Sequence, residues 1–394
     1  MIYSLAIILL FGFIFAKIFE KIDLPPLIGM IIVGIIIGPN LLNLIDKSVL
    51  DISAEIRKIA LIIILLRAGL NLTLDDLKKV GRPAILMCFV PALFEIIGFV
   101  ILGPILFNLS LIDSLLLGAV ISAVSPAVIV PQMIHVIENK YGTKEGVPQM
   151  ILAGASADDV FVIALFTSFL GLSLGGDFNF NNLINIPISI FLGIVVGGIF
   201  AYLIGKILNK SKIDIISKLI VIISFSFFIS ELEIIAKNYI AISGLIGVMT
   251  FGLVYRQKGS DVKEISLKLD SIWKFAQIFL FVLLGMSFNI SYVQKAGINA
   301  VLIILLALIF RLMGVYISLI KTKFTKNEKI FSMISYIPKA TVQAAIGGIP
   351  LAMGVKGGEI ILILAVISIL ITAPIGSILI EKTYRKLLKK EIIE

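Results

Sequence analysis

Long apolar segments follow one another along the whole chain, separated by short polar breaks. About 20 apolar residues in a helix span the hydrocarbon core of a bilayer, and about thirteen segments of that kind can be counted. They lie near residues 2–19, 26–45, 54–74, 83–107, 112–136, 147–172, 183–208, 214–230, 240–256, 268–289, 298–320, 330–354 and 359–381. Backbone groups in lipid must be satisfied within a segment, and these runs are too long and unalternating for barrel strands. The pattern predicts an all-α polytopic membrane protein with about thirteen transmembrane helices.

The distribution of charge orients these segments. Of the 394 residues 59% are hydrophobic and only 15% are charged, which excludes an ordinary soluble protein with a sizeable globular domain. Lysine and arginine gather in the breaks after odd-numbered segments and in the C-terminal tail. The positive-inside rule therefore predicts a cytoplasmic C-terminus and an N-terminus outside. The net charge of +9 is then explained by topology and by contact with anionic lipid, and nucleic acid is not an expected partner.

A few charged residues fall inside the apolar segments. Ionised side chains at the bilayer centre are costly and usually mark a pathway or a cavity. The basic ones are Arg67, Lys274, Arg311 and Lys339, and the acidic ones are Glu95, Asp158 and Asp159. Lys274 lies close enough to a segment end to reach the membrane surface. Glu95, Asp158, Arg311 and Lys339 each lie roughly 12–20 Å from a segment end at 1.5 Å per residue, so four segments bring charge to one depth.

Two segments carry helix breakers near their centres. Pro126 follows Ser125 in the fifth segment, and Pro338 precedes Lys339 in the twelfth. Proline removes a helical hydrogen bond and clashes with the preceding turn, so each helix is expected to be kinked or unwound there, although an ordinary proline kink is the alternative. If segments one to six and eight to thirteen are inverted halves, the interruptions occupy equivalent fifth helices. Such a pair is typical of the binding site of a secondary transporter.

Asp158 and Asp159 are adjacent on the sixth segment and point about 100° apart around its axis. Burial and a neighbouring like charge both favour the protonated form of a carboxyl group, whereas Na⁺ or Li⁺ prefers ionised oxygen ligands. The hydroxyl groups of Ser122 and Ser125 and the carbonyls of an unwound helix could complete such a site. Protons and a cation would then compete for the same oxygens. A pair neutralised by lysine or arginine only for packing is the alternative.

The other buried polar residues have less specific roles. Glu95 and Arg311 are expected to form a charge-compensating pair or a structural lock within the bundle. Lys339 could reach unwound carbonyls or a carboxylate and act as a tethered cation. Weaker candidates, for which hydrogen bonding between helices is an equal alternative, are Thr341, Gln343 and Arg67.

Several motifs resemble the monovalent cation:proton antiporter-2 superfamily, and most closely its mammalian-type sodium/proton exchanger branch. They are LPPLIGMIIVGIIIGPN at 24–40, LLRAGLNL at 65–72, SAVSPAVIVP at 122–131, GVPQMILAGASADDVFVI at 146–163 and IPKATVQAAIG at 337–347. The resemblance implies an inverted-repeat fold with two crossed discontinuous helices, in which Asp159 is the principal ion and proton carrier and Asp158 its partner. Arg311 would stand where electrogenic relatives have a lysine, so the stoichiometry stays open. Val124, Ser125 and Pro126 replace the Thr-Asp-Pro run of other branches.

The resemblance also implies that different parts of the chain form two functional domains. Helices one to three (1–77) and eight to ten (213–294) would form a dimerisation domain, joined by a linker helix in 176–212. Helices four to six (78–175) and eleven to thirteen, with the tail (295–394), would form a transport core that moves like an elevator. A homodimer in a cell membrane, of a prokaryotic type from its isoleucine- and lysine-rich usage, is expected.

The functional prediction is antiport of Na⁺ or Li⁺ against H⁺, without a cofactor. A K⁺/H⁺ antiporter and an ion-coupled symporter of an organic solute on the same fold remain alternatives, although adjacent intramembrane acids disfavour an anionic solute. An intramembrane aspartyl protease needs carboxylates facing each other from two helices, and the chain has no ring or filter motif of a channel. An enzyme is therefore not expected.

Overall fold

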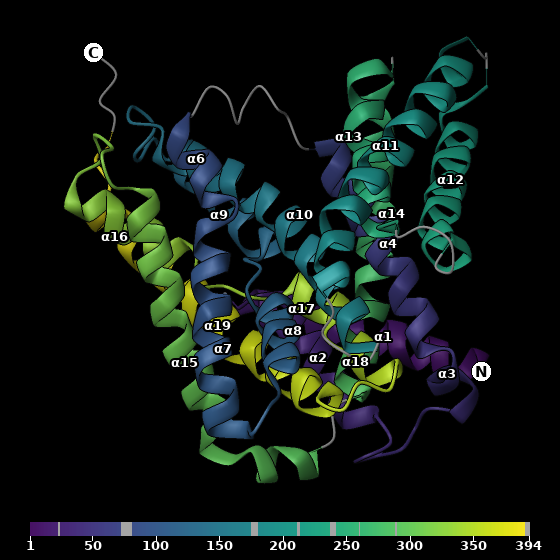
Figure 1. Cartoon of the computed structure of the whole chain (residues 1–394), viewed down its shortest axis with the longest axis horizontal. Helices are drawn as coiled ribbons and strands as arrows, with labels where there is room; N and C mark the ends of the chain where they lie inside the picture. Colours follow the sequence, from purple (N-terminus) through teal and green to yellow (C-terminus); the bar gives the residue numbers. More distant parts are fainter. Residues whose placement is uncertain are drawn as a thin grey trace. The chain divides into compact units, whose positions relative to one another are not determined.

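The computed structural model describes residues 1–22, 24–71, 81–174, 180–210, 213–236, 242–259, 261–287 and 290–390 (Figure 1). Within these ranges the regular structure is helical, apart from an isolated antiparallel bridge between Tyr141 and Lys390. The helices are α1 (Ile2–Lys21), α2 (Pro26–Ile37), α3 (Lys47–Asp51), α4 (Ser53–Asn71), α6 (Arg82–Met87), α7 (Val90–Phe107), α8 (Leu111–Ile121), α9 (Pro126–Glu138), α10 (Val147–Leu174), α11 (Phe180–Lys210), α12 (Ile215–Ala236), α13 (Gly244–Lys258), α14 (Val262–Met286), α15 (Ile290–Ser318), α16 (Lys326–Ser335), α17 (Thr341–Ile346), α18 (Ile349–Ala352) and α19 (Gly358–Leu387).

Each predicted apolar segment contains helix, so the all-α prediction is confirmed. By length and composition, 8 helical stretches among the described residues could cross a membrane. Shorter apolar helices include Pro26–Ile37, Phe161–Leu174 and Thr341–Ala352. The chain is therefore a polytopic helical membrane protein. The count of about thirteen crossings and the orientation of the termini stay predictions.

Three predicted helices are divided in the structure. The segment 83–107 forms α6 and α7, which meet at a turn at Cys88 and Phe89. Pro91, next to the first residue of α7, lacks an N–H and its ring clashes with the carbonyl four residues earlier, so the helix cannot run straight through. The segment 112–136 is divided before Pro126 into α8 and α9. The segment 330–354 is divided around Pro338 into α16 and α17, and at Gly347 and Gly348 into α17 and α18.

The chain forms two compact units. Unit 1 comprises Met1–Ala54, Leu74–Val162 and Phe281–Glu394, and unit 2 comprises Glu55–Thr73 and Ile163–Leu280. Within unit 1, α7 packs along α15, and α19 contacts α8, α9, α16, α17 and α18. The five predicted domains divide the chain by function and not by compactness, and they stay a prediction.

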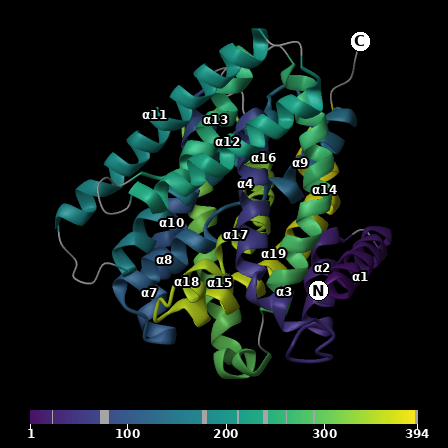
Figure 2. The same cartoon turned by 90° about the vertical axis from the view of Figure 1, so that its right-hand side faces the viewer.

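Unit 2 contains the bundle of α11, α12 and α13, which lie beside one another in both views (Figures 1 and 2). Glycines allow α11 and α13 to approach closely. A Cβ on Gly197 would lie 2.2 Å from the carbonyl oxygen of Gly247, and one on Gly193 would lie 2.5 Å from that of Ser243. Small residues at a helix crossing permit van der Waals packing of the backbones, which is the main attraction between helices in lipid.

Candidate functional site

Two unwound stretches in unit 1 lie next to each other and define the site. The first, residues 122–125, separates α8 from α9, and the second, residues 336–340, separates α16 from α17. Pro126 begins α9, where its missing N–H costs nothing and its fixed φ suits a first helical residue. The backbone N–H of Ser125 donates to the carbonyl of Pro338 at 2.9 Å. The two interruptions are therefore joined by a direct backbone hydrogen bond.

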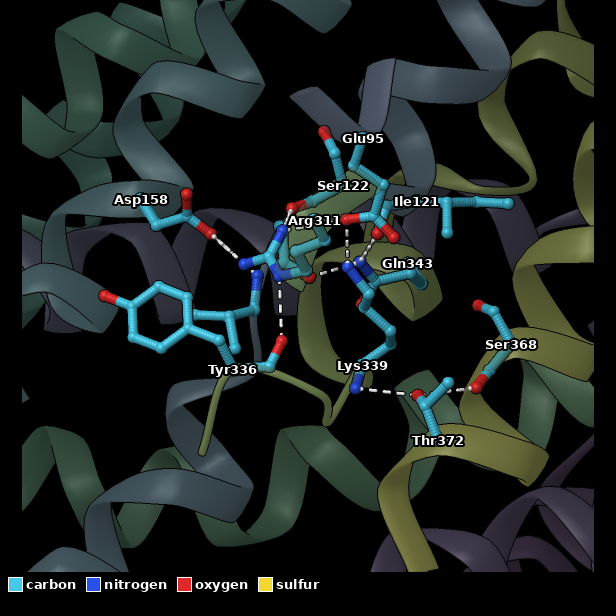
Figure 3. Close-up of polar contacts among 12 residues, drawn as sticks. Glu95, Ile121, Ser122, Asp158, Arg311, Tyr336, Lys339, Gln343, Ser368 and Thr372 are labelled. Atoms are coloured by element: carbon cyan, nitrogen blue, oxygen red, sulfur yellow. Dashed lines mark hydrogen bonds and ion pairs between the residues drawn. The ribbon is translucent and has the colours of Figure 1, made fainter. Parts of the chain in front are cut away.

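Arg311 projects from α15 into the middle of these stretches and is completely buried (Figure 3). Its Nε donates to the carbonyl of Tyr336 at 2.8 Å, and its Nη1 donates to the carbonyl of Ser122 and to Glu95 Oε2, the latter at 2.8 Å. Its Nη2 donates to Asp158 Oδ2 at 3.2 Å. The planar fork of a guanidinium group can satisfy several acceptors at fixed angles, which a lysine cannot do. Arg311 thus connects α7, α10 and both interruptions.

Glu95 is shared by two cations. Its Oε2 accepts from Lys339 Nζ at 2.5 Å as well as from Arg311, and all three side chains are at most 2% exposed. The backbone N–H of Lys339 donates to Thr372 Oγ1 of α19 at 2.9 Å, and that hydroxyl donates to the carbonyl of Ser368 at 2.7 Å. The second interruption is therefore anchored on one side by Glu95 and on the other by α19.

The two adjacent aspartates of α10 have different surroundings. Asp158 is fully buried, and its Oδ2 accepts from the backbone N–H of Val124 at 2.7 Å and from Arg311. Asp159 is 5% exposed, and its Oδ1 has no hydrogen-bond partner within the described chain. Asp158 is thus held by a fixed donor and a fixed cation, whereas Asp159 has no ion-pair partner among the described residues.

The formal charges of the cluster do not balance. Arg311 and Lys339 supply two positive charges, while Glu95, Asp158 and Asp159 supply three negative charges when ionised. Because an isolated buried charge is very costly, a cluster with one carboxylate in excess favours the uptake of one further positive charge. A proton or a monovalent metal ion would provide it.

Oxygen atoms for such an ion are present, and some of the backbone carbonyls already accept a hydrogen bond. The carbonyls of Ile121, Ser122 and Ala123 already accept hydrogen bonds from Gln343 or Arg311. Among the described residues, the buried side-chain oxygens without a partner include, at this site, Ser122 Oγ, Ser125 Oγ, Asp158 Oδ1, Asp159 Oδ1, Tyr336 Oη, Thr341 Oγ1 and Gln343 Oε1. The described residues contain no group of three or more histidine, cysteine, aspartate or glutamate residues suited to a transition metal. Hydroxyl and carboxylate oxygens suit a hard alkali ion.

The structure brings most of the predicted site residues together. Arg67 belongs to unit 2, where its Nε donates to Asp270. Tyr336 and Thr372 also belong to the site and were not predicted from the sequence. The guanidinium carbon of Arg311 lies 5.4 Å from the centre of the Tyr336 ring, and Thr372 caps the backbone of Lys339. Tyr336 directly precedes the IPKATVQAAIG motif, but contacts of this kind leave no signal in a single sequence.

Comparisons with known proteins identify the family of the chain. The model of the family described as sodium/hydrogen exchanger, transmembrane, matches residues 5–386. Sodium/hydrogen exchanger 9B2 of Mus musculus is 30% identical over 386 residues, which cover 93% of this chain and 69% of the relative. Sodium/hydrogen exchanger 9B1 of Homo sapiens is 30% identical over 378 residues, which cover 90% of this chain and 71% of the relative.

A solved structure shows the same fold. The sodium proton antiporter MjNhaP1 from Methanocaldococcus jannaschii at pH 8 superposes with a TM-score of 0.86 and 23% identity, covering 97% of each chain. The resemblance inferred from the sequence motifs is therefore confirmed at the level of the family. From the match over residues 5–386 and the identity to the exchangers, we conclude that this chain belongs to the transmembrane sodium/hydrogen exchanger family.

Proposed function

We propose that this protein exchanges Na⁺ or Li⁺ for H⁺ across its membrane, and that the two ions take turns on Asp159. The unequal environment of the two aspartates carries this proposal. Asp158 Oδ2 is engaged by Val124 and Arg311, so its charge is compensated within the protein. Asp159 has no such partner among the described residues, so its charge is compensated only by what it binds.

The exchange follows from competition for one carboxylate. With a proton bound, Asp159 is neutral and its oxygens are poor ligands for an alkali ion. With the proton released, the carboxylate oxygens, together with nearby hydroxyls such as those of Ser122 and Ser125, favour a hard monovalent cation. The charge of the cluster is compensated only when it holds one proton or one cation. The site therefore changes sides of the membrane only with one of these ions bound, in either direction. One Na⁺ is then exchanged for one H⁺.

The cluster also disfavours the symport of an organic anion. A binding site for a carboxylate needs uncommitted positive charge or helix N-termini. Arg311 and Lys339 are both paired with carboxylates in the buried cluster, and the acid in excess would repel an anion. A K⁺/H⁺ antiporter would use the same mechanism and would differ only in which cation the site prefers.

We further propose that residues 78–175 and 295–394 move as a transport core against a dimerisation domain formed by residues 1–77 and 213–294. The hydrogen bond between Ser125 and Pro338 supports this, because it ties both interruptions into one body that could carry the ion as a unit. The protein would act as a homodimer in a cell membrane, without a cofactor.

Proteoliposomes that contain an internal pH dye test the proposed function. A pH gradient, acidic inside, is imposed, and Na⁺, Li⁺, K⁺ or choline is added outside. Alkalinisation of the lumen on addition of Na⁺ or Li⁺, but not of choline, is the expected result. A silent dye with all four cations, from protein shown to be inserted and folded, would contradict antiport.

A further inference from the structure

The carbonyl groups at the C-terminal end of α8 are held by side chains of other helices. The last carbonyls of a helix have no partner within the helix and must be satisfied elsewhere. The Nε2 group of Gln343 donates to the carbonyls of Ile121 and Ala123 at 2.9 and 2.8 Å. The carbonyl between them, that of Ser122, accepts from Arg311. These three carbonyls are thereby oriented toward protein donors.

Gln343 belongs to the second interrupted helix, because it lies in α17, and it is completely buried (Figure 3). It lies within the part of the site where Val124 donates to Asp158 and Ser125 donates to Pro338. Ile121 and Ala123, whose carbonyls accept from Gln343, alternate along the chain with two other residues of the site. These are Ser122, which contacts Arg311, and Val124, which contacts Asp158. Its carboxamide therefore helps to fix the conformation of the unwound stretch that contacts Asp158.

The number of oxygens that an alkali ion meets influences which ion is preferred. K⁺ is larger than Na⁺ or Li⁺ and accommodates more ligands, and the number and field strength of carbonyl dipoles contribute to discrimination between them. Two additional mobile carbonyls near a carboxylate site would therefore favour the larger ion. In this structure the carbonyls of Ile121 and Ala123 are directed toward the N–H groups of Gln343, which sets their orientation.

We propose that Gln343 is a positioning residue for cation selectivity, which keeps the carbonyls of Ile121 and Ala123 away from the transported ion and so favours Na⁺ or Li⁺ over K⁺. This inference rests on the proposed exchange at Asp159. It goes beyond that proposal because it assigns the choice of ion to the N–H groups of Gln343, which act on two carbonyls and not on the ion.

The experiment replaces Gln343 with methionine, which has a similar shape but no N–H donor, and with alanine. Gln132 offers a matched control. It lies in α9, outside both interruptions, and its Nε2 donates to the carbonyl and the hydroxyl of Ser377 on α19. Gln132→Met therefore also removes a partly buried amide that donates to a carbonyl, but one that holds no carbonyl of either interruption.

Two readouts are needed for each purified protein. The first is the ratio of the K⁺ and Na⁺ concentrations that give a half-maximal dye response. Where K⁺ is not transported, the K⁺ concentration that half-inhibits the response to Na⁺ takes its place. The second is the ratio of the K⁺ and Na⁺ concentrations that stabilise the detergent-solubilised protein against heat. If the role of Gln343 were purely structural, its replacement would lower the melting temperature without changing either ratio.

Since one neutral hydrogen bond corresponds to roughly a two- to tenfold effect, both Gln343 variants are expected to lower the K⁺ to Na⁺ ratio by about threefold or more. Gln132→Met should leave the ratio unchanged.

The inference is overturned if the ratio stays within about twofold of wild type in both Gln343 variants. It is also overturned if neither variant folds while Gln132→Met does. A wild-type protein that binds Na⁺ but does not exchange it would overturn the proposed function, and the heat-stabilisation ratio would still judge the role of Gln343.

Discussion

At the scale of single residues, the site is a set of charges in which Arg311 has the most partners. It donates to two carboxylates and to a carbonyl in each of the two interruptions. Removing one partner of a buried ion pair leaves the other charge uncompensated, which costs more than the pair contributes. The architecture of the site therefore depends on Arg311, while the ion itself is proposed to bind elsewhere.

Arg311→Ala is expected to destabilise the protein by about 3–5 kcal/mol, as is typical when a buried pair is broken. The apparent affinity for Na⁺ should change less, because Asp159 is not among the residues that Arg311 contacts. Arg311→Lys keeps the charge but loses the fork of donors, and should fall between wild type and alanine in stability. Melting curves and Na⁺ titrations of the purified proteins measure both quantities. A large loss of Na⁺ affinity in a variant that melts like wild type would place Arg311 in the ion site instead.

The sequence was informative about charged residues and uninformative about their pairing. Glu95, Asp158, Arg311 and Lys339 stand out because charge inside an apolar segment is rare, and their depth predicted that they would meet. The sharing of Glu95 by Arg311 and Lys339, and the difference between Asp158 and Asp159, depend on side-chain directions to within a few ångströms. A single sequence contains no such information. The stacking of Arg311 on Tyr336 was unpredictable for the same reason.

At the scale of elements, helix breaks could be found wherever proline stood at the centre of a segment. Pro126 and Pro338 marked the two interruptions at the site. The break between α6 and α7 was missed, although Pro91 marks it, because a proline inside an apolar segment does not always divide a helix. Pro104 in α7 and Pro374 in α19 lie inside continuous helices. The fate of the carbonyls at the breaks was also unpredictable. At the first break, the carbonyls of Ile121, Ser122 and Ala123 accept hydrogen bonds from Gln343 and Arg311, and their role as ion ligands stays a prediction.

Helix α10 must lie close to the second interruption, and Gly154 makes this possible. A Cβ at Gly154 would lie 2.2 Å from the hydroxyl oxygen of Tyr336 and 2.8 Å from Met87 Cβ. Gly154→Ala should therefore cost about 1–3 kcal/mol, as overpacking of a core does, and should slow exchange by displacing the aspartates. Gly171→Ala on the same helix, where nothing lies within 4 Å of the added atom, should be neutral or stabilising.

The double variant Gly154→Ala, Tyr336→Phe tests this explanation. Removing the hydroxyl group relieves the closest contact, so part of the lost stability and exchange should return. Melting temperature and dye response of the two single variants and the double variant give the coupling between the two positions. Strictly additive effects would show that the contact between Gly154 and Tyr336 is not the cause.

At the scale of the whole molecule, the balance of charges predicts electroneutral exchange. A buried cluster with one carboxylate in excess takes up one proton or one monovalent cation, so no net charge crosses the membrane. Moving one charge through about 100 mV corresponds to about 2.3 kcal/mol, so an electrogenic exchanger would respond strongly to voltage. Solid-supported membranes should record no sustained charge displacement on a Na⁺ jump, while the pH dye responds. A current of a size matching the dye response would mean that Asp158 also carries a proton.

The orientation in the membrane is a second prediction at this scale. After Cys88→Ser removes the native cysteine, Lys140→Cys should be labelled by an impermeant maleimide only from the cytoplasmic side. Lys47→Cys should be labelled only from the outside. Both positions are exposed, so access is not limited by the fold. The reverse pattern would invert the topology inferred from the basic residues.

Exchange by Asp159→Asn tests the central claim most directly, because asparagine keeps the size of the side chain and removes its charge and its proton. The variant is reconstituted beside wild type and Asp158→Asn, with insertion and folding checked by size-exclusion chromatography and melting. Asp159→Asn should show no dye response above protein-free liposomes at any Na⁺ concentration, although it folds. Coupled exchange at the wild-type rate by Asp159→Asn would contradict the account.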